Sequence, residues 1–437
     1  MASTIVLDLS HGPDNPRNSE GSFVTLADGR ILFAYTRYYG ESWADDATAR
    51  ICARYSADDG CSWSERDELL VEREGRCNVM SVSLLRLQDG RIGLWYLRKN
   101  SLADCRAYLR TSRDEGKSWS RPVLCIPAPG YFVVNNDRVI QLRGGRIVVP
   151  ASYHRTRLAP DRRRQSPCGA ADERGLALSF LSDDGGRTWR ESSDWWALPV
   201  RSKAGLQEPG IIELTDGRLY ACCRTDTGCQ YEMVSADGGD TWSPPRPAVF
   251  RSPRSPLSIK RLPGTGDLLA VWNDHSGQLA PVHPAEHSFT SKSWGRTPLV
   301  AAISRDDART WERHKLIESD PQRGFCYTAI HDTGAAVLLA YCCGGGDRGA
   351  VLQDLCIRRV TLDWLYGQPR GVCRTLPSAD SKSRVPTDSS GKTARKLIDS
   401  RPKTAEKTRF CLEQPVEHGQ KPCTNAKSDR LLGDRRR

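Results

Sequence analysis

The stretch Ser182-Asp-Asp184-Gly-Gly186-Arg-Thr188-Trp189 decides how this chain folds, because it is one of five copies of a single pattern. The pattern is Ser-x-Asp-x-Gly-x-Ser/Thr-Trp, which we call the Asp-box. The other copies occupy residues 56–63, 112–119, 235–242 and 304–311, and the last of these has Ala308 in place of the glycine. Internal repetition is the sequence signature of an architecture assembled from repeated units.

Each Asp-box has the composition of a hairpin turn. The Asp accepts hydrogen bonds from turn amides, and the Gly adopts a backbone angle that other residues resist. The Ser or Thr hydroxyl bonds locally, and the Trp covers the turn with apolar area. We therefore interpret the boxes as structural elements that do not contact substrate. The copy with Ala308 is expected to be strained or differently shaped.

A second repeat lies between the boxes, in which a Leu precedes a Gly-containing turn and a β-rich run. An example is Leu214-Thr-Asp216-Gly217-Arg218-Leu219, and Asp-Gly between apolar runs is a strong hairpin signal. The six copies cover residues 26–32, 87–92, 142–148, 214–219, 262–269 and 332–338. Six such units interleaved with the boxes predict an all-β, six-bladed β-propeller with Asp-box hairpins over residues 1–372.

The composition changes after this region. The chain has 437 residues and a formal net charge of +11. From about Pro377 onward it is rich in Ser, Lys, Arg and Asp and has almost no aromatic residues, so residues 373–437 are predicted to be a disordered basic tail. A solvating tail is favoured over a patch that binds nucleic acid or a membrane, and neither is expected as a partner. The oligomeric state is left open.

The cysteines and the N-terminus indicate a compartment and argue against a metal. The sixteen Cys are scattered, and several lie in apolar runs, as in Ala221-Cys222-Cys223, where they act as small hydrophobic residues. No Cys-x-x-Cys pair or His cluster has ligand spacing, so no metal and no cofactor are expected. The first residues lack the features of a signal peptide, which predicts a cytoplasmic protein unless an unrecognised export route exists.

Four residues give the chain a resemblance to the sialidase (neuraminidase) superfamily, in particular to bacterial Asp-box exo-sialidases, over roughly residues 15–345. Glu208 follows Leu206-Gln, and Arg224 ends the next β-rich run. Arg296 lies eight residues before the box serine Ser304, and Tyr327 precedes the last Asp-Thr-Gly turn. The resemblance implies that arginines bind the carboxylate of sialic acid, that Tyr327 is the nucleophile and that Glu208 accepts its proton.

The N-terminal part departs from the family pattern. Arg17 and Arg37 compete for the role of the first arginine. The acid/base Asp is also out of register, and of the adjacent pair Asp45 and Asp46 we favour Asp46, with a solvated acidic loop as the alternative. A further cluster is expected to face the central funnel of a propeller and to contact substrate, unless it is a capped turn with a partly buried His. It consists of Asp137, Arg138 and His154.

The favoured function is that of a retaining exo-glycosidase that removes terminal sialic acid, or a related carboxylate-bearing sugar, from a sialoglycan or other acidic oligosaccharide. Two alternatives remain open. The first is a uronate polysaccharide lyase on a related propeller, for which Tyr153 and His154 would be base and acid. The second is a non-catalytic carbohydrate-binding propeller. The sequence does not identify the sugar or the linkage.

Overall fold

The computed structural model describes residues 2–157, 170–282 and 292–367, all of which lie in one compact unit formed by residues 1–373. These residues form an all-β structure whose only described helix is α1 (Leu362–Tyr366). The tail predicted at 373–437 lies outside the described residues. The fold class predicted from the repeats is thus confirmed as all-β.

Four sheets contain four antiparallel strands each. One consists of β2 (Asn18–Thr25), β3 (Ile31–Tyr38), β4 (Ala49–Ser56) and β5 (Glu68–Val71). The next is formed by β15 (Gln207–Glu213), β16 (Leu219–Arg224), β17 (Cys229–Ser235) and β18 (Arg246–Arg251). A third is formed by β19 (Ser258–Arg261), β20 (Leu268–Asn273), β21 (Leu299–Ser304) and β22 (Glu312–Glu318). The fourth joins the N-terminal β1 (Ser3–Leu9) to β25 (Leu355–Thr361), β24 (Ala336–Cys342) and β23 (Cys326–Asp332).

The fifth sheet has nine strands. It contains β6 (Asn78–Arg86), β7 (Ile92–Ser101), β8 (Asp104–Ser112), β9 (Val123–Leu124), β10 (Tyr131–Val133), β11 (Ile140–Gln141), β12 (Ile147–Arg157), β13 (Ala170–Ser182) and β14 (Arg190–Glu191). A parallel contact of Tyr131 in β10 with Cys105 in β8 joins its two halves. The repeats predicted separate four-stranded units. The short strand β10 instead bridges two groups of strands, so the described residues form five sheets.

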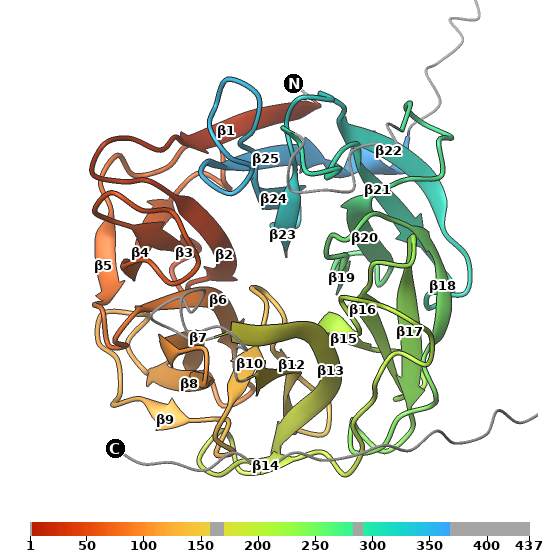
Figure 1. Cartoon of the computed structure of the whole chain (residues 1–437). Helices are drawn as coiled ribbons and strands as arrows, with labels where there is room; N and C mark the ends of the chain where they lie inside the picture. The colour runs from red at the N-terminus through yellow and green to blue at the C-terminus, as the bar shows by residue number, and fades with distance from the viewer. Residues whose placement is uncertain (1, 158–169, 283–291, 368–437) are drawn as a thin grey trace, which may run out of the picture. The chain divides into compact units, whose positions relative to one another are not determined.

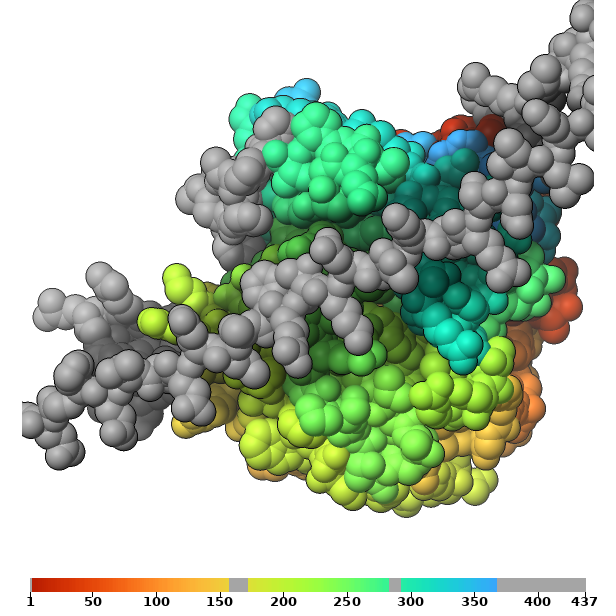
Figure 2. Space-filling model, turned by 90° about the vertical axis from the view of Figure 1, so that its right-hand side faces the viewer, coloured from red at the N-terminus to blue at the C-terminus, as the bar shows by residue number. Residues whose placement is uncertain are grey.

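The sheets surround a common centre, with β2, β6, β15, β19 and β23 nearest to it (Figure 1). Figure 2 shows the side of the unit on which the green to blue-green residues of β15–β18 and β19–β22 lie next to each other. The hydrophobic core is distributed between neighbouring sheets. For example, Phe250 and Trp272 pack with residues of β15 and β21, and Phe33 packs with Leu338 and Ile357. Because the apolar side chains pack between sheets, the strands nearest the centre can carry polar side chains that face it.

The Asp-boxes form the hairpin turns that their sequence predicts. The five boxes begin at the ends of β4, β8, β13, β17 and β21. The box that begins at the end of β13 illustrates the hydrogen bonds of the turn. The amide of Gly186 donates to Ser182 Oγ at 2.9 Å, and the carboxylate of Asp184 accepts from both the amide (2.9 Å) and the hydroxyl (2.6 Å) of Thr188. The boxes therefore hold the turns through their own side chains.

The copy with Ala308 keeps the same turn. The amide of Ala308 donates to Ser304 Oγ at 2.9 Å, and Asp306 accepts from Thr310, as in the other boxes. Ala308 adopts φ 66°, which is left-handed backbone that a residue with a Cβ resists. The expected strain is present, and the expected alternative of a different shape is wrong because the hydrogen bonds impose the glycine conformation.

We expect the substitution Ala308→Gly to raise the free energy of unfolding by about 0.5–1 kcal/mol, because relief of the left-handed strain exceeds the entropy that glycine adds to the unfolded chain. The reciprocal variant is Gly116→Ala. There φ is +83° and a Cβ would meet Trp119 only at an ordinary 3.6 Å, so the backbone alone should lower stability. Chemical denaturation of both variants measures the difference, and a less stable Ala308→Gly protein would contradict this account.

Candidate active site

A cavity of about 340 Å³ collects several of the residues predicted from the sequence. Glu208, Arg224, Arg296, Tyr327 and His154 all line it. The remaining lining residues are mainly polar or aromatic and are Trp43, Asp45, Tyr131, Val133, Asp172, Glu173, Gln207, Arg254, Trp294 and Leu352. Residues more than 300 positions apart in the chain thus meet at one place.

The inner strands share a local irregularity that sequence patterns do not reveal. In β2, β6, β15 and β23 the pairing register shifts, and a non-glycine residue at each shift adopts left-handed backbone. These residues are Glu20 (φ 55°), Ser81 (60°), Glu208 (48°) and Tyr327 (59°). Bulges re-aim side chains, and positive φ in such residues is costly enough to be concentrated at functional sites. Two of the four line the cavity, namely Glu208 and Tyr327.

Tyr327, Glu208 and Arg224 form a contiguous polar group. The hydroxyl of Tyr327 donates to Glu208 Oε1 at 3.3 Å. Nη1 of Arg224 lies 2.8 and 2.9 Å from the two carboxylate oxygens of Glu208 and 3.3 Å from the Tyr327 oxygen. Burial opposes ionisation of Glu208, but the charges of Arg224 and Arg296 lower its pKa. Burial and the nearby Glu208 raise the pKa of Tyr327, which keeps the phenol protonated in the ligand-free protein.

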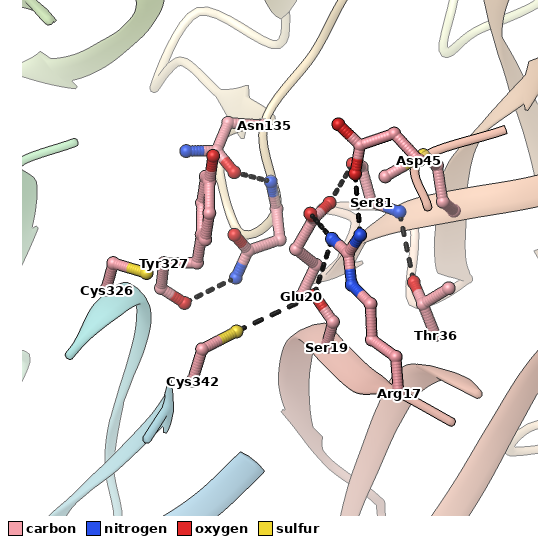
Figure 3. Close-up of polar contacts among 12 residues, drawn as sticks. Arg17, Ser19, Glu20, Thr36, Asp45, Ser81, Asn135, Cys326, Tyr327 and Cys342 are labelled. Carbon is pink, nitrogen blue, oxygen red and sulfur yellow. Dashed lines mark hydrogen bonds and ion pairs between the residues drawn. The ribbon is translucent and has the colours of Figure 1, made fainter. Parts of the chain in front are cut away.

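Arg17 is fully buried and joins two carboxylates. Its Nη2 lies 3.0 Å from Glu20 Oε1, and its Nη1 lies 2.6 Å from Asp45 Oδ1 (Figure 3). Its guanidinium also lies over the ring of Tyr38 at 4.7 Å, and Ser81 donates to the second oxygen of Glu20. The buried Glu20 therefore holds the guanidinium of Arg17 in place. Asp45, the second carboxylate bound to this guanidinium, lines the cavity.

Asp45 lies on the loop between β3 and β4, and its side chain remains 66% exposed. Enclosure by surrounding atoms opposes its ionisation, but Arg17 and Lys99 outweigh this effect and lower the pKa of Asp45 to about 2. Two side chains from β6 and β7 hold this loop in place. Lys99 Nζ and Asn78 Nδ2 donate to the backbone carbonyl of Asp45 at 2.8 and 2.9 Å.

Arg296 completes a set of three buried arginines. It is 2% exposed, and its guanidinium lies 5.2 Å from the centre of the Tyr327 ring and 5.5 Å from that of Trp294. Its Nη1 donates to Cys326 Sγ at 3.0 Å. No carboxylate is within ion-pair distance of Arg296 among the described residues, so its charge is available to an anionic ligand in the cavity.

The other predicted positions lie elsewhere. Neither Arg17 nor Arg37 lines the cavity. Arg17 pairs with Asp45, which does line it, whereas Arg37 pairs with Asp67 at 3.2 Å, so only Arg17 is linked to the site. Asp46 is also absent from the lining, whereas its neighbour Asp45 is present. The preference for Asp46 among the two carboxylates thus finds no support in the geometry, because the loop turns Asp45 toward Arg17.

Asp137 and Arg138 line a second cavity of about 440 Å³ and not the one that contains Tyr327. Asp137 forms an ion pair with Lys260 at 2.9 Å, and Arg138 donates to the carbonyl of Leu257 at 2.6 Å. Their expected contact with the same substrate is not supported. His154 does line the first cavity, where its Nδ1 lies 2.9 Å from the carbonyl of Asp172 and burial lowers its pKa.

Sequence reasoning missed the residues that support the site. Glu20 lies three positions after Arg17, and a carboxylate so close to a candidate arginine was an available signal. Lys99 and Asn78 carry no such signal, because their role depends on contact with a loop from another sheet. Among the described residues, no group of three or more His, Cys, Asp or Glu side chains is arranged to hold a metal ion. The same residues include no helix of the length and apolarity that a membrane crossing requires.

The cavity thus brings together two buried arginines, a Tyr–Glu pair and an exposed Asp that pairs with a third buried arginine. Residues 51–338, more than half of the chain, match the model of the BNR repeat-like domain family, and the chain belongs to that family. A sialidase of Micromonospora viridifaciens is 27% identical over 234 residues, which are 52% of this chain and 32% of that protein. The chain therefore matches about a third of this relative's length.

Solved structures give the same fold. A protein of unknown function from Dyadobacter fermentans superposes with a TM-score of 0.60 at 18% identity, over 82% of this chain and 99% of that one. The NanB sialidase of Streptococcus pneumoniae gives a TM-score of 0.59 at 14% identity, over 83% and 71% of the two chains. The resemblance to sialidases predicted from the sequence is confirmed at the level of family and fold.

Proposed function

We propose that this protein is a retaining exo-glycosidase that hydrolyses terminal sialic acid, or a related carboxylate-bearing sugar, from glycans. The observation that carries the proposal is the contact of the Tyr327 hydroxyl with Glu208 and Arg224 in a cavity that Arg296 also lines. The relationship to sialidases supports a glycosidase-type activity. We also propose that the sheets form six blades over residues 1–372, of which the nine-stranded sheet supplies two.

The three arginines would bind the sugar carboxylate. Arg224 and Arg296 line the cavity, and Arg17 lies behind Asp45, with which it forms an ion pair at 2.6 Å. A guanidinium presents parallel donors that match both oxygens of a carboxylate, and burial strengthens this interaction. Such a cluster of positive charge also disfavours neutral and cationic sugars, so the clamp selects the substrate class.

Tyr327 would attack the anomeric carbon. A neutral phenol avoids the repulsion that a carboxylate nucleophile would meet from the carboxylate of the substrate. Glu208 would take the phenolic proton as the bond from the Tyr327 oxygen to the sugar forms, while Arg224 stabilises the developing negative charge. The resulting glycosyl–tyrosine bond would then be broken by water, with overall retention of configuration.

Asp45 would protonate the leaving oxygen and later remove a proton from the attacking water. In the ligand-free protein its charge is stabilised by Arg17, which lowers its pKa. A substrate carboxylate would compete for the same guanidinium. This competition would raise the pKa of Asp45 and make it able to carry a proton when substrate is bound.

The substitution Asp45→Asn is expected to lower kcat for a substrate with a poor leaving group by about 10²- to 10⁴-fold, the range typical of a lost general acid. A substrate with a good leaving group needs less protonation and should be affected less. Asp46→Asn is the matched control, because Asp46 lies next in the chain and does not line the cavity. Equal losses in both variants would contradict the role of Asp45.

Release of a fluorescent aglycone from an α-sialoside tests the proposed function as a whole. We expect turnover by the purified full chain and none from matching glucosides, which lack the carboxylate. The lyase alternative receives no support from Tyr153, which packs on Phe132 at 5.1 Å between ring centres and does not line the site cavity. Absence of turnover with α-sialosides, together with cleavage of uronate polymers to unsaturated products, would overturn the proposal.

A further inference from the structure

Cys326 lies directly beside the proposed nucleophile and contacts the substrate clamp. It precedes Tyr327 at the bulge in β23, and its Sγ accepts a hydrogen bond from Arg296 Nη1 at 3.0 Å. Arg296, Tyr327 and Leu352 all line the cavity, and Cys326 packs with Leu352 one layer behind that wall. The state of this sulfur therefore affects an arginine that the proposed reaction uses.

A second thiol is in position to react with it. Cys342 in β24 is the register partner of Cys326 in β23, and both belong to one small apolar cluster with Val351 and Leu352. Directly opposite residues of antiparallel strands have Cα atoms about 4.5 or 5.5 Å apart, within the roughly 4.4–6.8 Å that a disulfide spans. In Figure 3 the sulfur of Cys326 lies beside Tyr327, and the sulfur of Cys342 is directed toward Ser19. The Sγ of Cys342 lies 3.6 Å from Ser19 Oγ.

The surroundings make Cys326 the reactive member of the pair. Burial raises its pKa, but the neighbouring Cys342 thiol and the charges of Arg296 and Arg224 outweigh this and lower the pKa to about 7. The pKa of Cys342 is raised well above its ordinary value, first by the interaction with Cys326 and then by burial. Because a thiolate is the nucleophilic form of cysteine, the lowered pKa favours Cys326 over Cys342 as the attacking thiol.

We propose that Cys326 is a site of reversible oxidation in the carbohydrate pocket, at which a peroxide links Cys326 to Cys342 by a disulfide. The thiolate sulfur of Cys326 attacks one peroxide oxygen, the O–O bond breaks, and the released hydroxide takes up a proton to become water. The sulfur of Cys342 then attacks the sulfenic sulfur, the S–O bond breaks, and the departing hydroxide takes the Cys342 proton. Two thiols lose two electrons and one peroxide becomes two waters.

Oxidation would weaken the clamp. Arg296 donates to the sulfur of Cys326, and a disulfide sulfur, which carries no charge, is a poorer acceptor than a thiolate. The new bond would also tie the backbone before Tyr327, whose left-handed conformation sets the direction of its side chain, to β24. The effect on catalysis rests on the proposed function, whereas formation of the disulfide does not.

The experiment treats the reduced full chain with hydrogen peroxide, blocks the remaining thiols and maps the disulfides by mass spectrometry. We expect a Cys326–Cys342 bond, at least a tenfold loss of aglycone release from an α-sialoside, and recovery of both thiols and activity with dithiothreitol. Sialyllactose in the pocket should slow the oxidation. Formation of the bond in a protein that shows no turnover would retain this inference and count only against the proposed function.

Two variants make the test specific. Cys342→Ala should keep the activity of the reduced protein. After peroxide treatment, dithiothreitol should not restore its activity, because the sulfenic acid of Cys326 then has no resolving thiol. If Cys342→Ala unfolds at too low a temperature, Cys342→Ser is used in its place. Cys356→Ala is the matched control. The side chains of Cys356 and Cys343 interact, but the two residues are diagonal neighbours across β24 and β25. Diagonal Cα separations of about 7–8 Å exceed the disulfide range.

The inference is overturned if peroxide oxidises the exposed Cys61 while Cys326 and Cys342 stay reduced in the folded protein. It is also overturned if the mapped bond joins Cys343 to Cys356. A Cys326–Cys342 bond with unchanged turnover would contradict the link between Cys326 and the Arg296 clamp.

Discussion

The substitution Tyr327→Phe is expected to lower the release of aglycone from an α-sialoside by at least about 10³-fold, which corresponds to about 4 kcal/mol of lost transition-state stabilisation. Only the hydroxyl is removed. The ring beneath Arg296 stays, as do the left-handed backbone and the bulge that aim it, so affinity for sialyllactose should change by no more than a few fold. A fluorogenic assay and titration calorimetry measure the two quantities separately.

Tyr131→Phe is the matched control for this variant. Tyr131 lines the same cavity, and the centre of its ring lies 5.5 Å from Lys99 Nζ. Unlike Tyr327, it forms no hydrogen bond with Glu208 among the described residues. We expect this variant to retain turnover within a few fold. Full activity of Tyr327→Phe, or an equal loss in Tyr131→Phe, would show that the phenol of Tyr327 is not the nucleophile.

The second large effect is expected at Arg17. In Arg17→Met the carboxylate of Glu20 stays buried without its cation, and removal of one partner of a buried pair typically lowers the free energy of unfolding by about 3–5 kcal/mol. The double variant Arg17→Met/Glu20→Gln removes both charges, and Ser81 can still bond to the amide. It should recover most of the stability, as measured by chemical denaturation.

In these two variants, binding of the sugar should not recover together with stability. The double variant lacks the guanidinium that contacts Asp45, so binding of sialyllactose should remain weakened by at least tenfold even when folding is restored. Restored binding in the double variant would show that Arg17 acts only as a structural partner of Glu20. Loss of stability in both variants to the same extent would contradict the proposed cost of an unpaired Glu20.

The parts of the fold that were predictable are those encoded locally. An Asp-box contains the donor, the acceptor and the glycine of its own turn, so Ser182 and Asp184 make in the structure the bonds that the sequence implies. The bridge between β8 and β10 was not predictable. It depends on the tertiary position of a three-residue strand, and nothing near Tyr131 in the sequence specifies a parallel partner.

The candidate site divides in the same way. Glu208, Arg224, Arg296 and Tyr327 were found because they match the sialidase pattern in order and in position relative to the repeats, and all four line one cavity. The choice between the adjacent carboxylates on the loop before β4 depends instead on Lys99 and Asn78, which hold that loop from another group of strands. Bulges at inner strands have no recognisable pattern, so the direction of the side chains at these positions required the structure.

The central claim is that Tyr327 forms a covalent bond to the sugar. A fluorinated sialoside whose glycosyl-enzyme intermediate breaks down slowly tests it most directly, with peptide mapping by mass spectrometry after short incubation. We predict one sugar adduct on the peptide that contains Tyr327, and none in Tyr327→Phe. Turnover of the parent sialoside with no adduct, or with an adduct on any other residue, would contradict the account.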